Sequence, residues 1–173
     1  KKMAVVFTML FFNSLFAQVH AEKLHYEIRF GFIKGGEAIY QINENNYNGE
    51  IHATLHGYTT GFARRLYGVN DYFESFIPKE QNAPARTVKK LNEKDHRYDE
   101  EITFDHKKGV AYSKKTGYQT VKSGICDVSS VMYHLRSSGK LNNLKKNQVI
   151  EIPFWDTGEW YMLSLKYTGT EKI

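Results

Sequence analysis

The sequence predicts a mainly β protein: an antiparallel open barrel or half-barrel of about ten strands, with one amphipathic helix packed against it. Two observations predict this fold. Short segments of alternating apolar and polar residues recur at intervals of roughly 8 to 12 residues, separated by polar or glycine-bearing turns. Only one stretch has the length, apolar spacing and end signals of an amphipathic helix. The chain of 173 residues shows no repeat or linker and is long enough for a single domain.

The first strands have the clearest pattern. Apolar residues alternate with polar ones from Leu24 to Phe32, as expected for a half-buried strand. We place a turn at residues 34–36 and a second strand over residues 37–43, so that the two strands form a hairpin. A third strand begins at Ile51. Further strands are expected over residues 69–77, 86–91, 98–105, 110–114, 118–122, 148–155 and 159–168.

The predicted helix runs from Asp127 to Ser138, with Asp127 as its cap and Gly139 as its stop. Its expected buried stripe has helical spacing and consists of Val128, Val131, Met132 and Leu135. The segment TTGFARRLYG, residues 59–68, predicts a second, shorter helical turn.

Residues 1–21, KKMAVVFTMLFFNSLFAQVHA, have the pattern of a secretory signal peptide, with a basic start, an apolar stretch and a small-x-small end. We expect cleavage after Ala21. An uncleaved membrane anchor is the alternative, but the apolar run is shorter than the ~20 residues that span a bilayer. Residues 22–173 would then form one exported β-rich domain without a membrane-spanning segment.

Charge and cysteine content exclude several classes of function. Removing the signal peptide takes away two lysines and no acidic residue, which lowers the formal net charge from +5 to +3. Basic and acidic residues are interleaved, as in DHRYDEEITFDHKKG, which is typical of a mixed solvated surface and argues against nucleic acid as a partner. The single cysteine, Cys126, cannot form an internal disulfide.

Cys126 is the one candidate for nucleophilic catalysis. It stands just before the predicted helix, where the helix dipole lowers the pKa of a thiol. His134 cannot be its base, because eight residues of helix separate the two by about 12 Å along the axis. We therefore favour a structural cysteine and predict no catalytic residue. A hydrolase that uses a base from elsewhere, such as His25 or His56, is left open.

No metal site and no cofactor are expected. His52 and His56 form an H-x-x-x-H pair, which on a helix would place two ligands on one face. Both lie in a predicted strand, where four residues span about 13 Å, too far for one ion. His96 and His106 stand among acidic residues without compact ligand spacing.

The candidate ligand-binding residues are Tyr58, Arg64, Arg65, Tyr72 and Trp155. The two arginines lie on a short connection between tyrosines, where they would guard a barrel mouth and pair with an anionic head group. Trp155 would belong to an exposed aromatic platform for a sugar.

A structural role is the alternative for each of these residues. Phe62 and Leu66 would pin the connection while the arginines bridge to Asp71 and Glu74, which is the interpretation we favour. The tryptophans would form a cross-strand pair.

Five segments occur in order along the chain: YEIRFGFIKGGEAIY, TTGFARRLYGVNDYFES, DEEITFDH, CDVSSVMYHLRS and YMLSLKYTGTEKI. In these segments the chain resembles the exported-protein family catalogued as domain of unknown function 3108, over nearly all of residues 22–173. The resemblance implies a mostly antiparallel β architecture and a place in the periplasm or outer envelope of a Gram-negative bacterium. It implies further C-terminal strands beyond this chain, and it carries no catalytic residues.

We therefore expect a non-enzymatic envelope protein whose barrel-like interior binds a lipid or another hydrophobic ligand. The alternative is an envelope module that binds a protein or a glycan on its outer face.

Overall fold

The computed structural model describes residues 21–44 and 49–170, so the predicted signal peptide lies outside the described residues except for Ala21. The chain is mainly β, and every predicted strand has a counterpart. The elements are, in order, β1 (Glu22–Phe30), β2 (Ile33–Asn43), β3 (Ile51–Thr59), α1 (Gly61–Leu66), β4 (Asn70–Ile77), β5 (Arg86–Glu93), β6 (His96–Asp105), β7 (Val110–Ser113), β8 (Gly117–Thr120), α2 (Val131–Ser137), β9 (Val149–Asp156) and β10 (Glu159–Lys166).

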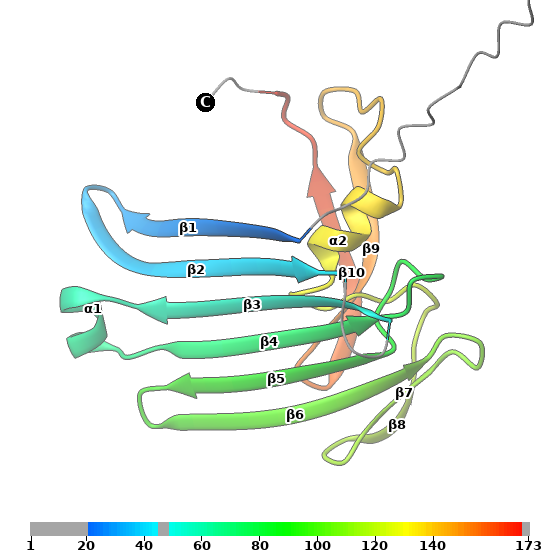
Figure 1. Cartoon of the computed structure of the whole chain (residues 1–173), viewed down its shortest axis with the longest axis horizontal. Coiled ribbons are helices and arrows are strands. Elements are labelled where there is room, and N and C mark those ends of the chain that lie inside the picture. The colour runs from blue at the N-terminus through cyan, green and yellow to red at the C-terminus, as the bar shows by residue number, and fades with distance from the viewer. Residues whose placement is uncertain (1–20, 45–48, 171–173) are drawn as a thin grey trace, which may run out of the picture.

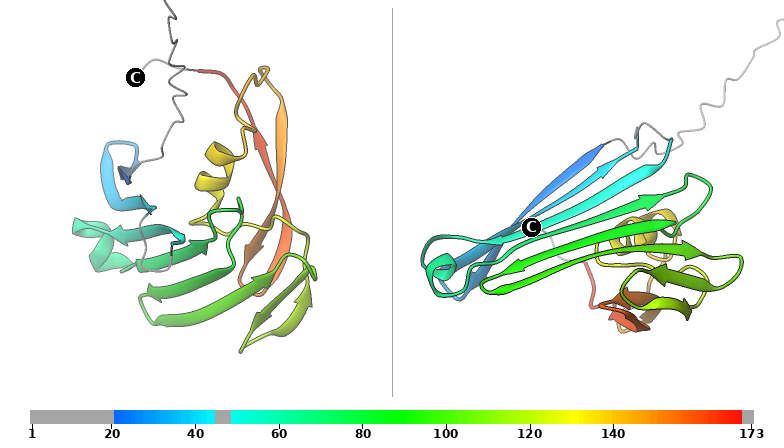
Figure 2. Two further views of the ribbon diagram at one scale, coloured as in Figure 1. Left: turned by 45° about the vertical axis from the view of Figure 1, so that its right-hand side comes forward. Right: turned by 90° about the horizontal axis from the view of Figure 1, so that it is seen from below.

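β1 to β8 form one antiparallel meander in which each strand pairs with the next, and β9 and β10 form a separate hairpin. Figures 1 and 2 show that the large sheet is curved and that α2 and the hairpin lie on one side of it, which we call the inner face. The sheet is not closed. β9 pairs instead with the chain before α2, through a parallel bridge between Cys126 and Phe154. The prediction of a mainly β, antiparallel fold is thus confirmed, with the strands divided between an eight-stranded sheet and a two-stranded one.

The core has three apolar clusters, two of which include residues of α2. Tyr133 of α2 packs on the strands β2 to β4, whereas Leu135 packs on the β9–β10 hairpin. A third cluster joins β6 and β7 to the hairpin through Phe104 and Trp155, whose rings meet edge to face at 5.9 Å. The helix therefore lies between the sheet and the hairpin, and both of these sides are buried.

This position corrects the predicted stripe of α2. Tyr133, His134 and Leu135 are buried, while Met132, placed in the stripe by its spacing, is exposed. Three consecutive residues are buried because the helix is covered from two directions. The Nδ1–H of His134 donates to the carbonyl of Asn82 at 2.8 Å, which satisfies one of its buried ring nitrogens.

The start of α2 also differs from the prediction, since the regular helix begins at Val131. The amide of Ser130 donates to the Asp127 carboxylate at 2.9 Å, and the amide of Asp127 donates to the Ser130 hydroxyl at 2.8 Å. Asp127 does satisfy an amide, as a cap would. The side-chain bonds of this turn compete with regular helix geometry and delay its start.

The turn between β1 and β2 lies at Gly31 and Phe32 rather than at residues 34–36. Gly31 has a φ of 60°, a conformation that glycine adopts without strain. Gly36 is instead part of β2, where a side chain would meet the Tyr58 carbonyl oxygen at 2.6 Å. The glycine pair that suggested a turn thus serves close strand packing.

Candidate functional site

The inner face is buried at one end of the strands and exposed at the other end. The pairings place Ile42, Ala53, Ser75, Thr87 and Ile102 side by side, and all five are buried beneath α2 and the turn before it. Toward the opposite end of the strands, where Figure 1 shows α1, the same face has no helix or hairpin over it. One half of the inner face is therefore covered and the other half is open.

The open half has apolar and small residues. One row consists of Tyr26, Ala38 and Gly57, and the next contains Ile28 beside Gly36. Tyr26 is 44% and Ile28 is 51% exposed, although both belong to the face that forms the core further along the sheet. A Cβ atom at Gly57 would meet no atom within 4 Å, so there is free space above this row. Gly36 is buried, so we call the other four residues, Tyr26, Ile28, Ala38 and Gly57, the open inner face.

Asp71 continues the row of Gly57 and supplies its acidic group. Its carboxylate accepts the backbone amide of Asn92 at 2.9 Å, and burial raises the pKa of this carboxyl group. The acid is thus half-buried and hydrogen-bonded rather than free in solution.

A pocket of about 390 Å³ lies at the same end of the sheet, next to α1. Three cationic side chains line it from different elements: Arg64 of α1, Lys94 of the β5–β6 turn and Arg97 of β6. No carboxylate lines it; the remaining lining residues are His56, Tyr58, Thr59, Gly68, Val69, Asn70 and Asn92. We call it the cationic pocket.

Backbone hydrogen bonds fix the position of these cations. The amide of Lys94 donates to the Gly68 carbonyl at 2.6 Å, and Val69 forms an antiparallel bridge with Glu93. The connection that carries α1 is therefore held against the β5–β6 turn. Arg97 donates to the Lys94 carbonyl at 2.9 Å, which places its guanidinium over the same turn.

The cations of the pocket are not neutralised by ion pairs within the described residues: Arg64, Lys94 and Arg97 have no carboxylate within salt-bridge distance. Oxyanions such as phosphate and carboxylate are the groups that arginine binds best, through paired N–H donors. The arrangement suits an anionic group.

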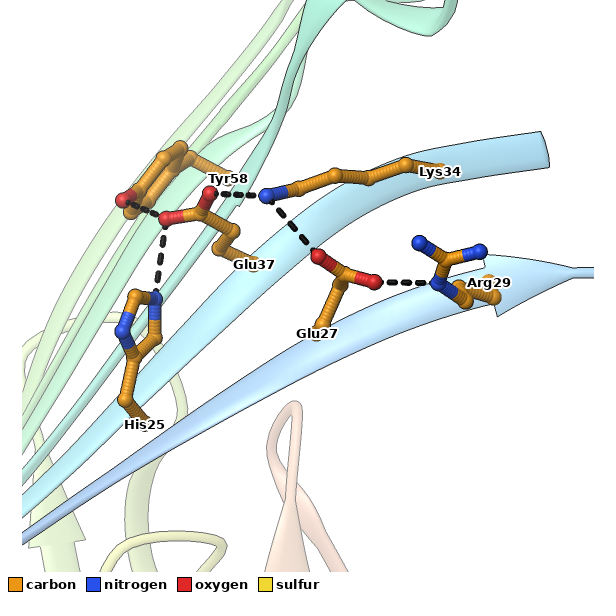
Figure 3. Close-up of polar contacts among 6 residues, drawn as sticks. All are labelled: His25, Glu27, Arg29, Lys34, Glu37 and Tyr58. Carbon is orange, nitrogen blue, oxygen red and sulfur yellow. Dashed lines mark hydrogen bonds and ion pairs between the residues drawn. The ribbon is translucent and has the colours of Figure 1, made fainter.

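Glu37 is one of two carboxylates among the described residues that contact a residue of the pocket, the other being Asp71, and other groups already engage it (Figure 3). It accepts a hydrogen bond from the Tyr58 hydroxyl at 2.5 Å and pairs with Lys34 at 2.6 Å and with His25 at 2.9 Å. These contacts, chiefly that of Lys34, lower the pKa of Glu37 to about 2. Glu37 therefore holds β1, β2 and β3 together and does not compete for the pocket cations.

The five predicted ligand-binding residues lie in different surroundings. Tyr58 and Arg64 line the cationic pocket, and Tyr72 lies beside it with its ring edge toward His56 at 6.0 Å. Arg65 is exposed on α1 outside the pocket lining. Trp155 is 4% exposed within the core, so it presents no ring face to a sugar.

The favoured structural role for the α1 segment is wrong. Phe62 and Leu66 are 67% and 63% exposed, so they do not pin the connection by burial. Asp71 and Glu74, the expected partners of the arginines, bind the Asn92 amide and His52 instead. The β alternation places Asp71 on the inner face and Glu74 on the outer face, so the two carboxylates lie on opposite sides of the sheet.

A buried polar cluster before α2 was not predicted. The Asp127 carboxylate accepts the hydroxyls of Ser75 at 2.6 Å and Ser130 at 2.5 Å, and Ser129 lies beside both. Burial raises the pKa of Asp127, because the hydrogen bonds offset only part of the cost of an ionised group there. The cluster is enclosed and faces no large pocket, so it anchors the helix.

Cys126 is buried, as predicted. Burial, and after it the neighbouring Asp127, raise the pKa of its thiol to about 12. His25 and His56, the two suggested bases, bind Glu37 and Asn70 on the outer face. In the part of the chain that the structure describes, no cluster of three or more ligating side chains is placed to hold a metal ion, and no helix is long and apolar enough to cross a bilayer.

Comparisons with known proteins agree with the resemblance noted in the sequence. Neither the curated proteins nor the solved structures include a match to this chain. A family model described as "Protein of unknown function (DUF3108)" matches residues 25–173, which is nearly the whole of the chain. The chain therefore belongs to the DUF3108 family.

Proposed function

We propose that this protein is a non-enzymatic binding module for a lipid or another hydrophobic ligand, exported to the envelope of a Gram-negative bacterium. The ligand lies on the open inner face, within the curve of a half-barrel. The observation that carries the proposal is that an apolar sheet face continues beyond its cover, with Tyr26 and Ile28 exposed and free space above Gly57.

The physical argument is the cost of exposed apolar surface. Burying apolar area is worth about 25 cal/mol per Å², and large exposed apolar patches on soluble proteins mark binding surfaces. The small residues Ala38 and Gly57 continue the row of Tyr26 across β2 and β3 and leave room for a chain-like ligand. The acidic group that borders this surface, Asp71, has its carboxylate hydrogen-bonded to the Asn92 amide.

The experiment tests whether a side chain that fills the space above Gly57 prevents lipid binding. Gly57→Phe places a ring above the open row without a steric clash, since nothing lies within 4 Å of its Cβ position. We expect the wild-type protein to retain acyl-chain lipids in native mass spectrometry after incubation with a lipid mixture, and Gly57→Phe to lose them. Gln41→Phe is the matched control, because Gln41 is exposed in β2 on the other side of the sheet.

The result would count against the proposal if the wild type stayed empty across the lipid mixture, or if Gly57→Phe bound as much lipid as Gln41→Phe. Circular dichroism and urea unfolding establish that both variants are folded.

A further inference from the structure

Large apolar side chains are exposed together at one end of the sheet. Phe32, in the β1–β2 turn, is 90% exposed, and Phe62 and Leu66 of α1 are exposed as well. The start of β2 is joined to the residue before α1, because the amide of Thr60 donates to the Gly35 carbonyl at 3.1 Å. Figures 1 and 2 show the β1–β2 turn and α1 at this same end of the sheet. We call Phe32, Phe62 and Leu66 the apolar tips.

Packing within the fold does not explain why large apolar residues occupy the positions of the apolar tips. α1 buries none of its side chains, and backbone bonds to β2 and to the β5–β6 turn hold its segment in place. A connection of this kind needs only polar residues. Three large apolar side chains kept in water at one end of the sheet point to a partner that covers them.

The charges around the tips identify the class of partner. Arg64 and Arg65 lie between Phe62 and Leu66 in α1, and neither has a carboxylate partner among the described residues. The cationic pocket adds Lys94 and Arg97 next to Arg64. Exposed aromatic and aliphatic side chains flanked by unpaired arginines are the combination by which proteins bind the interface of an anionic membrane.

We propose that the α1 end of the sheet docks on the surface of an anionic lipid membrane. The apolar tips enter the head-group layer, and the arginines bind lipid phosphates there, one of them in the cationic pocket. The open inner face begins at this same end, since Ile28 and Tyr26 belong to the strand that leads into the β1–β2 turn. Docking requires no ligand on the inner face, so this inference stands apart from the proposed function.

The test measures cosedimentation of the purified protein with vesicles of phosphatidylglycerol and phosphatidylcholine, and with vesicles of phosphatidylcholine alone. We expect binding to the anionic vesicles only, with a decrease at high salt. The double variant Phe32→Ser, Phe62→Ser should bind the anionic vesicles at least about tenfold more weakly than the wild type. Arg64→Gln, Arg65→Gln should weaken binding by a similar factor, because each cation near an anionic surface contributes.

Matched controls come from elsewhere on the surface. Tyr118, in β8, is 78% exposed and aromatic but stands apart from the tips, so Tyr118→Ser should leave binding unchanged. Lys145→Gln, Lys146→Gln removes an equally charged adjacent pair from the α2–β9 connection and should also have no effect. The Gly57→Phe variant, in which the open inner face is blocked, should still bind the anionic vesicles.

The inference is overturned if the protein fails to bind anionic vesicles, if it binds both kinds of vesicle equally, or if the end variants bind as well as their controls. Urea unfolding of each variant excludes a loss of fold as the cause.

Discussion

The hydroxyl of Ser75 donates a hydrogen bond of 2.6 Å to the carboxylate of Asp127, which stands 52 residues further along the chain. Both side chains are buried. The bond joins the middle of β4 to the turn that leads into α2, so it connects the large sheet to its cover. It is the polar counterpart of the contact that Tyr133 makes with the same sheet.

Asp127→Ala should destabilise the protein strongly. The substitution removes the acceptor of the Ser75 hydroxyl, the Ser130 hydroxyl and the Ser130 amide, and it leaves these donors buried. We expect the free energy of unfolding to fall by about 3 kcal/mol in urea titrations. Ser75→Ala should cost about 1 kcal/mol, since the carboxylate keeps its other donors. Equal losses for the two variants would contradict the central role of Asp127.

The raised pKa of Asp127 should make stability depend on pH. The folded state holds the proton more tightly than the unfolded chain, so stability rises as the pH falls from above the raised pKa toward the ordinary value of 3.8. Asp127→Asn cannot titrate. As the pH is lowered from 7 to 4, the unfolding free energy of the wild type should therefore rise relative to that of Asp127→Asn. A difference independent of pH would show that this carboxyl group has an ordinary pKa.

Cys126 should resist alkylation in the native protein. With its pKa raised to about 12, the thiol carries almost no thiolate at neutral pH, and its side chain is buried. We expect iodoacetamide to label it only in denaturant. Ser164→Cys in a Cys126→Ser background places a thiol at an exposed position of β10 and should label rapidly. Rapid labelling of native Cys126 would restore the hypothesis of a cysteine-dependent hydrolase.

Two glycines of the inner face should respond differently to alanine. Gly36→Ala pushes a Cβ toward the Tyr58 carbonyl oxygen at 2.6 Å, which the backbone cannot relieve cheaply. We expect a loss of about 1–3 kcal/mol in the free energy of unfolding. Gly57→Ala meets open space and should be neutral or stabilising by up to about 1 kcal/mol. Similar losses at both positions would mean that the open row is packed after all.

The strands could be predicted from sequence because the alternation of apolar residues is a local property. Ala53, Ser75 and Ile102 share one face for this reason, and the structure confirms the strands that contain them. Boundaries were less accurate. The start of α2 depends on side-chain bonds among Asp127, Ser129 and Ser130, which propensity does not describe.

The site could be predicted only in part, because it depends on contacts between distant segments. Tyr58 and Arg64 were identified from one segment of sequence, but Lys94 and Arg97 join them only because the Lys94 amide binds Gly68. The exposure of Phe62 could not be predicted from sequence, because the i, i+4 spacing of Phe62 and Leu66 also fits a buried pair. Trp155 looked accessible beside a turn, yet its ring packs on Phe104 in the core.

The meander also determines how the chain can fold. Each of β1 to β8 pairs only with its neighbours in sequence, and single hairpins form in about 1–10 μs. The Ser75–Asp127 bond and the Cys126–Phe154 bridge close much longer loops, which costs more entropy and slows their formation. We therefore expect the curved sheet to assemble first and its cover to be added last, so that disruption of the cover should accelerate unfolding more than it slows refolding.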